Sequence, residues 1–145
     1  MPYCTDCHNS SAAGPGPGGG GMSPSGPHGS DFEYILERRY ETMDNTPFST
    51  SNYALCFKCH DSSVLMTSSA SGFELHSVHL NQGSPCSVCH DPHGSPEYIA
   101  LLNFDENIVF SSVSGQLRFE IIGDMGYCYL NCHGIEHDPR SYQRR

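Results

Sequence analysis

The cysteines of this chain occur in close pairs, and a histidine directly follows each pair. Three of the local strings read CTDCH, CFKCH and CSVCH, and the fourth reads CYLNCH, with one more residue between its cysteines. The cysteines are Cys4, Cys7, Cys56, Cys59, Cys86, Cys89, Cys128 and Cys132. The histidines that follow them are His8, His60, His90 and His133.

The string C-x-x-C-H is typical of the covalent attachment of haem c. Two thiols separated by two residues can add to both vinyl groups on one edge of a porphyrin, and the next residue then offers an imidazole to the iron. We expect the longer fourth string to reach both vinyl groups by bulging, since it stands beside three regular motifs. The sequence therefore predicts four haem c groups as cofactors.

Other interpretations of the cysteine pairs explain the pattern less well. Tetrahedral zinc sites also use C-x-x-C pairs, but they need no histidine directly after each second cysteine. A disulfide framework would scatter its cysteines along the chain. Thioredoxin-like redox chemistry needs a single pair in a βαβ context.

Five further histidines can supply the second axial ligands. They are His28, His76, His79, His93 and His137. Four bis-histidine haems need four of these five, so one is in surplus, and no methionine lies in a repeated context that would make it a rival. His93 follows His90 by only three residues and must serve a different haem, which makes the haems neighbours. His137 lies between two acidic residues, and we expect it to be the surplus histidine.

Iron that is fully coordinated favours electron transfer over catalysis, so we do not expect an enzyme. A multihaem reductase is the alternative, but it needs an open iron position and cationic groups around the substrate. The chain has only 7 lysines and arginines against 16 acidic residues. This net charge of -9 also disfavours nucleic acid and anionic membranes as partners.

The composition is lean for an apolar core, with 37% hydrophobic residues, 15 glycines and 10 prolines. We therefore expect a single tetrahaem domain, residues 1–145, that is mostly irregular, with a few short α-helices and one small β-hairpin around a stacked haem chain. Periodicity predicts a helix over residues 32–43 and short helices near 53–59 and 72–80. Alternation predicts a hairpin of residues 107–110 with 116–122, whose apolar side chains cover a haem or the small core. Those side chains are Val109, Leu117, Phe119 and Ile121.

An internal repeat connects the first and third motifs. Pro-His-Gly-Ser followed by Glu-Tyr-Ile occurs at residues 27–35 and again, shifted by one position, at residues 92–99. The first copy is preceded by a segment rich in glycine, proline and serine, residues 9–27, which we expect to be extended.

Two stretches, residues 73–95 and 126–142, resemble the multihaem cytochromes with doubled C-x-x-C-H motifs. The resemblance implies an exported electron carrier, extracellular or at the cell surface, or alternatively periplasmic. Some members of that group polymerise into filaments, or nanowires, in which a subunit can supply an axial histidine to its neighbour. We expect such a filament subunit, with other redox proteins or extracellular electron acceptors as partners. A soluble monomeric tetrahaem carrier of the periplasm is the alternative.

Two features of the chain ends and hydropathy complete the prediction. The sequence begins without a basic or apolar leader, so we expect either a removed presequence or a piece of a longer chain. No run of 18 apolar residues occurs, and we therefore expect no membrane span.

Overall fold

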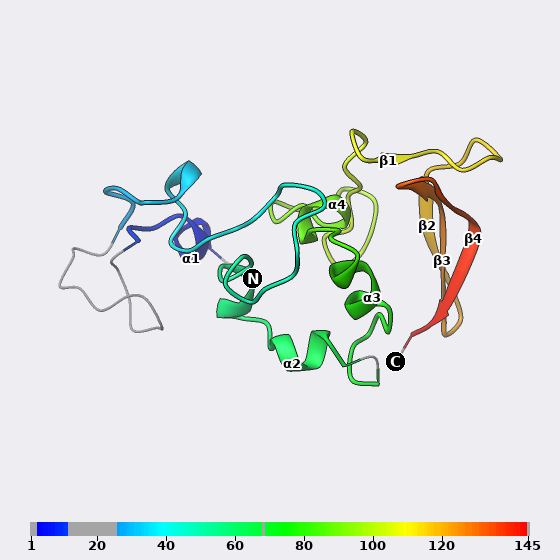
Figure 1. Ribbon diagram of the computed structural model, residues 1–145, viewed down its shortest axis with the longest axis horizontal. Coiled ribbons are helices and arrows are strands. Elements are labelled where there is room, and N and C mark those ends of the chain that lie inside the picture. Colours follow the sequence, from blue (N-terminus) through cyan, green and yellow to red (C-terminus); the bar gives the residue numbers. More distant parts are fainter. Residues whose placement is uncertain (1–2, 12–25, 68, 145) are drawn as a thin grey trace. The chain divides into compact units, whose positions relative to one another are not determined.

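The computed structural model describes residues 3–11, 26–67 and 69–144 of the chain (Figure 1). It divides into two compact units, one of Met1–Glu41 with Ser49–His60 and the other of Thr42–Phe48 with Asp61–Arg145. The first two cysteine motifs belong to the first unit, and the third and fourth belong to the second.

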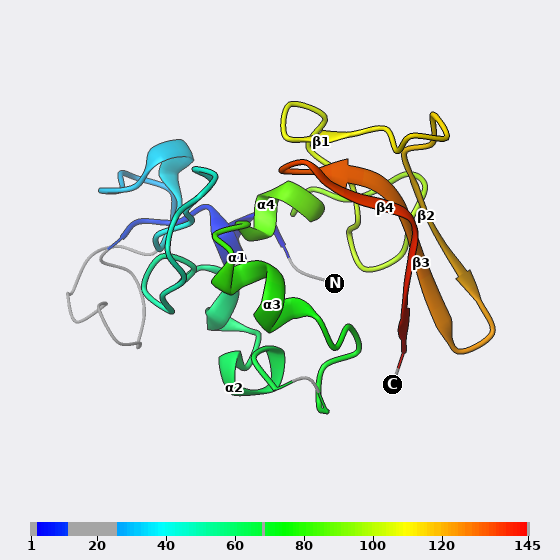
Figure 2. The same ribbon diagram turned by 45° about the vertical axis from the view of Figure 1, so that its right-hand side comes forward.

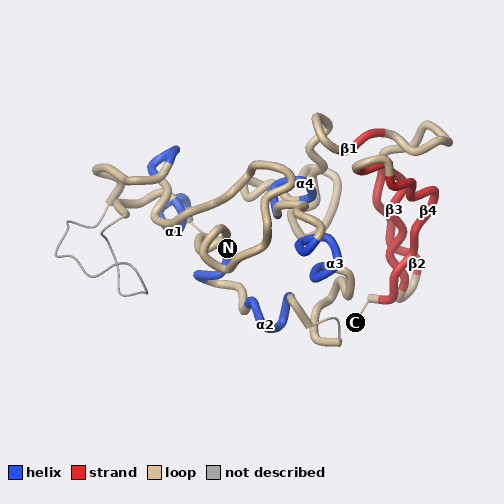
Figure 3. Tube along the Cα trace, viewed as in Figure 1, coloured by secondary structure: helices blue, strands red, loops and turns tan. Residues whose placement is uncertain are grey.

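Helices are short and loops predominate, as the composition predicts (Figure 3). The helices are α1 (Cys4–Cys7), η1 (Glu33–Ile35), η2 (Cys56–Lys58), α2 (Ser62–Leu65), α3 (His76–Asn81) and α4 (Cys86–Cys89). Segments of three to six residues are far below the length at which a helix is stable alone. They must therefore be held by the contacts that their side chains make.

The helix predicted over residues 32–43 is wrong. Only η1 forms there, and Tyr34 and Ile35 have left-handed φ angles of 58° and 56° that interrupt any helix. Leu36 then forms an antiparallel bridge with His8, which requires extended backbone. The other two predicted helices are present in part, as η2 and α3.

An antiparallel sheet forms the C-terminal part of the second unit (Figure 2). Its strands are β1 (Val109–Phe110), β2 (Arg118–Ile122), β3 (Met125–Cys132) and β4 (Ile135–Gln143). The predicted hairpin is wrong in its pairing, because β1 and β2 each pair with β3 and not with one another. The predicted turn at Ser114-Gly115 does exist, closed by a 2.7 Å hydrogen bond from Ser112 N–H to the Gln116 carbonyl.

Cysteines contribute to the small core of this unit. Val88, Val109 and Leu130 are its buried centre, and Cys89, Cys128 and Cys132 pack against it. Of the residues predicted to line the interior, Val109 and Phe119 are buried, Leu117 packs against the same cluster, and Ile121 is half-buried.

The two ends of the Gly/Pro/Ser-rich segment lie together. Ser10 N–H donates to the Gly26 carbonyl at 3.1 Å, and Gly26 N–H donates to Asn9 Oδ1 at 2.8 Å. Residues 12–25 lie outside the described residues, so the prediction of an extended segment over residues 9–27 stays a prediction. Within the described part of the chain, no helix is long and apolar enough to cross a membrane.

Candidate functional site

The three regular motifs each form the same type of backbone turn. In each, the histidine N–H donates to the carbonyl of the first cysteine, at 2.8 Å for His8, 3.0 Å for His60 and 2.9 Å for His90. This turn places both cysteines on one side of a helical turn, where side chains three residues apart have Cβ atoms about 5–6 Å from one another. Each turn therefore presents two thiols together, with the imidazole next to them.

The histidines of the first and third motifs are oriented in the same way. His8 Nδ1 lies 2.7 Å from the Tyr34 carbonyl oxygen, and His90 Nδ1 lies 2.9 Å from the Ala100 carbonyl oxygen. A carbonyl oxygen can only accept, so each Nδ1 carries the proton. The lone pair is thus left on Nε2, the state in which a neutral imidazole binds a metal.

The backbone around these two histidines repeats as well. Leu36 bridges His8 as Leu102 bridges His90. Ala100 and Leu101 both have φ angles of 58°, matching the left-handed pair that precedes Leu36. The structural repeat thus pairs residues 34–36 with 100–102. The sequence alignment, which paired residues 33–35 with 97–99, is displaced by two positions.

Two pairs of imidazoles face one another in the second unit. The ring centroids of His76 and His90 are 6.3 Å apart, and those of His79 and His137 are 6.5 Å apart. A metal–imidazole nitrogen bond is about 2.0–2.1 Å, so two rings bound on opposite sides of one ion have centroids about 6.3–6.6 Å apart. Two rings in a tetrahedral site would be closer, about 5.1–5.4 Å.

The Nδ1 atoms of the other three histidines in these two pairs also have oxygen partners. His76 Nδ1 is 2.7 Å from Ser71 Oγ, and His79 Nδ1 is 2.8 Å from the Leu75 carbonyl oxygen. His137 Nδ1 is 3.1 Å from the Ile135 carbonyl oxygen. Ordinary ring pairs can have the same spacing, but here every Nδ1 is engaged, which is the orientation typical of metal-bound histidines.

The position of His137 suits a metal ligand better than its sequence context indicates. It pairs across the sheet with Leu130, midway between Cys128 and Cys132, and cross-strand partners share a face. Burial lowers the pKa of His137, which favours the neutral, ligating imidazole. The arrangement does not favour the prediction that His137 is the surplus histidine.

The fourth motif departs from the other three. Cys128 and Cys132 lie on β3, with a register shift between Cys128 and Leu130, where a loop was predicted. The histidine of this motif, His133, has its Nε2 atom 2.7 Å from Asp44 Oδ2. The contact of His133 thus uses Nε2, whereas the carbonyl contacts of His8 and His90 use Nδ1.

Three candidate ligands are exposed to solvent. His28, His60 and His93 lie on the surface, and the side chain of His93 is 79% exposed and 3.3 Å from Asp91.

All eight cysteines have free thiols. Burial raises the pKa of Cys89 to about 12, with a contribution from the charges of Cys132 and Cys128, and raises that of Cys128 to about 11. Burial also raises the pKa of Cys7, which lies within electrostatic range of Cys56 and Cys59. The thiols of motifs one and two are thus neighbours, and so are those of motifs three and four.

Sequence reasoning missed three residues of these sites. Ser71 and Asp44 hold imidazoles from outside the motifs, and Lys58 connects two motifs. Only Lys58 carried a signal, because it is the chain's single lysine and lies inside a C-x-x-C-H string.

Among the described residues, no group of three or more histidine, cysteine or acidic side chains is arranged to hold a metal ion. The chain matches no family model, no curated protein and no solved structure.

Proposed function

We propose that this chain is an electron-transfer protein that carries haem c on its cysteine motifs. The observation that carries the proposal is the His76–His90 pair. One imidazole comes from a C-x-x-C-H turn and the other from α3, and their centroids are 6.3 Å apart with both Nδ1 atoms held. A spacing of 6.3 Å fits two imidazoles that would hold one iron between them, and it exceeds the roughly 5.1–5.4 Å expected of two imidazoles in one tetrahedral zinc site.

Cysteines, histidines and the groups that hold the imidazoles each have a separate role in this proposal. The cysteine pairs would form the thioethers, and the histidines would supply Nε2. Haem iron with two histidine ligands cycles between ferric and ferrous states, and so takes up and releases one electron. Ser71 and the carbonyls of Tyr34, Leu75 and Ala100 fix the imidazoles, which keeps ligand rearrangement small when the charge changes.

At the fourth motif, we propose that His137 and His79 would hold the haem iron. Their facing rings, 6.5 Å apart, lie beside the strand that carries Cys128 and Cys132. His76 and His90 would then serve the third haem. Five histidines remain for the first two haems, which need four: His8, His28, His60, His93 and His133. His133 then becomes the surplus histidine, because Asp44 already engages its Nε2.

The primary test counts the haems. Protein produced with the cytochrome c maturation machinery should gain about 0.6 kDa per haem and reach about 18 kDa from 15.9 kDa. The double variant Cys86→Ala/Cys89→Ala should be lighter by one haem. An unchanged mass of 15.9 kDa together with bound zinc would refute the proposal.

Assembly into filaments is a proposal that rests on the family resemblance alone. Negative-stain images of haem-loaded protein, with size-exclusion chromatography at rising concentration, test it. Polymers of regular repeat would support a filament subunit, and a single particle near 18 kDa would favour a monomeric carrier.

A further inference from the structure

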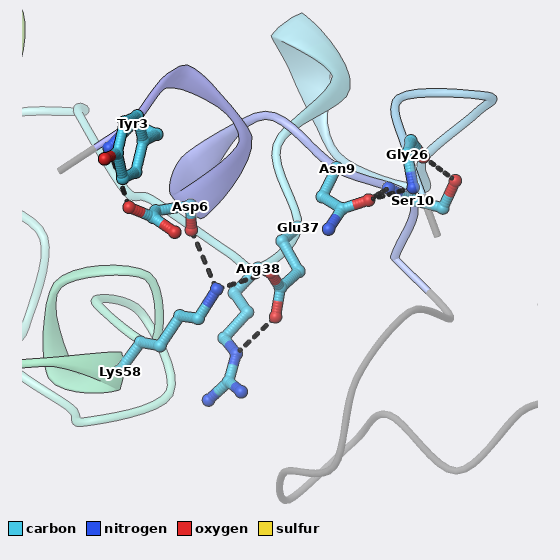
Figure 4. A network of polar contacts seen from close by, with 8 residues as sticks. All are labelled: Tyr3, Asp6, Asn9, Ser10, Gly26, Glu37, Arg38 and Lys58. Carbon is cyan, nitrogen blue, oxygen red and sulfur yellow. Dashed lines mark hydrogen bonds and ion pairs between the residues drawn. The ribbon is translucent and has the colours of Figure 1, made fainter. Parts of the chain in front are cut away.

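Lys58 connects the first two cysteine motifs. It lies in the string CFKCH of the second motif, yet its Nζ donates to the Asp6 carbonyl at 2.8 Å, inside the first motif (Figure 4). The same Nζ donates to Glu37 Oε2 at 2.6 Å. The only lysine of the chain is thus held by a turn 52 residues away in the sequence.

Glu37 is anchored to the same turn by its backbone. Its N–H donates to the Cys7 carbonyl at 2.8 Å, and its side chain is only 6% exposed. Arg38 Nε lies 3.4 Å from the second carboxylate oxygen. A carboxylate this buried needs its cationic partners, because an unpaired buried charge is strongly destabilising.

We propose that Lys58 and Glu37 form a charged bridge that fixes the spacing of the first two haem-attachment turns and sets the reduction potentials of their haems. This inference rests on the proposed function, since it assigns the bridge a role only in a haem-loaded chain. Lys58 and Glu37 are positioning residues, because neither belongs to the attachment or ligand set.

The location of the bridge supports an electrostatic role beyond simple packing. Lys58 Nζ lies 2.8 Å from the carbonyl oxygen of Asp6, the residue directly before Cys7, and Glu37 N–H donates to the Cys7 carbonyl. Lys58 itself stands directly before Cys59 in the second motif. A charge between two attachment turns acts on both of them.

The sign of each charge predicts the sign of each shift. Reduction lowers the positive charge on iron, so a nearby cation favours the reduced state and a nearby anion favours the oxidised state. Lys58→Met should therefore lower the potentials, and Glu37→Gln should raise them. A purely structural disturbance has no reason to change direction between these two variants.

The test is a redox titration of haem-loaded variants, resolved haem by haem through NMR of the porphyrin methyl groups. We expect each variant to change the one-electron equilibrium constant of the first two haems on the order of tenfold, which corresponds to about 59 mV, in opposite directions. The matched control is Arg39→Met, which removes an equal charge from a side chain that is 54% exposed and pairs with Glu41. Its shift should be several-fold smaller.

The double variant Lys58→Met/Glu37→Gln controls for a folding defect, because it removes both charges of the Lys58–Glu37 pair and leaves only the partly exposed Arg38 without its carboxylate partner. Its potentials should return close to those of the parent. Shifts of the same sign in both single variants, or an Arg39→Met shift as large, would overturn the inference. A parent protein without covalent haem by mass would instead refute the proposed function, so the two failures are distinguishable.

Discussion

His133 Nε2 and Asp44 Oδ2 are 2.7 Å apart, although 89 residues separate them in the sequence. Asp44 Oδ1 is buried and has no hydrogen-bond partner among the described residues. The contact uses the one imidazole nitrogen that a motif histidine would offer to iron. A carboxylate and an iron cannot both occupy that position, so His133 has one partner or the other.

The first prediction compares His133 of the fourth motif with His137, which lies on β4. His137→Ala in the haem-loaded protein should convert one low-spin haem to high spin, because His137 faces His79 at 6.5 Å. His133→Ala and Asp44→Ala should leave the low-spin spectrum unchanged. The measurement is optical and EPR spectroscopy of the three variants.

The opposite spectra would be informative as well. If only His133→Ala loses the low-spin signal, the iron ligand is His133 of the motif. The contact between His133 and Asp44 must then open when haem is loaded. This result would contradict the proposal that His133 is the surplus histidine.

The second prediction concerns Gly126 on β3, over which the ring of Tyr142 packs. A Cβ at Gly126 would overlap that ring, and overpacking of this kind typically costs about 1–3 kcal/mol. Gly126→Ala should therefore lower the free energy of unfolding by that amount in denaturant titrations. Tyr142→Leu in the same background should recover part of the loss, and strictly additive effects would contradict the contact.

The third prediction tests the left-handed pair of the repeat. Ala100 has a φ of 58° and is exposed, so Ala100→Gly removes strain at the cost of some chain entropy. We expect the free energy of unfolding to stay level or to rise by about 1 kcal/mol. Exposed Ala70 provides the matched control: Ala70→Gly should destabilise by about 0.5–1 kcal/mol. Equal destabilisation by both changes would be evidence against the strained turn.

The fourth prediction uses pH to distinguish thiols from thioethers. Burial raises the pKa of Cys89 to about 12 from an ordinary value of 9.0, so the folded state holds the proton more tightly than the unfolded state. The stability that this thiol contributes to the haem-free chain is complete below pH 9.0 and is lost as the pH rises towards about 12. Thioethers do not titrate, so the haem-loaded protein should lack this component. Urea unfolding of both forms across this range is the measurement, and identical pH profiles would contradict it.

The local parts of the site were predictable from sequence because they depend on local geometry. A C-x-x-C-H string fits one helical turn, and the structure has that turn at His8, His60 and His90. The longer fourth string does not fit the turn and lies on a strand instead. Spacing thus predicts the turn where the motif is regular and fails where it is not.

The tertiary parts were not predictable from periodicity. The apolar stripe over residues 32–43 suits a helix, but the bridge between Leu36 and His8 requires extended backbone. In the same way, the fourth cysteine string was expected only to bulge, whereas it lies on β3, whose residues Cys128 and Leu130 pack into the core. Which histidines face one another depends on these long-range contacts, and a histidine count cannot supply them.

The hydrogen bonds among Asn9, Ser10 and Gly26 offer a practical opportunity for protein engineering. Because they clamp the two ends of the segment together, a change in the length between them alters closure entropy only slightly and leaves the clamped neighbours in place. An affinity tag, a fluorophore or a surface-coupling peptide could be inserted there without moving the first cysteine turn. The position thereby provides a site at which the protein can be attached to a surface through one defined part of the chain.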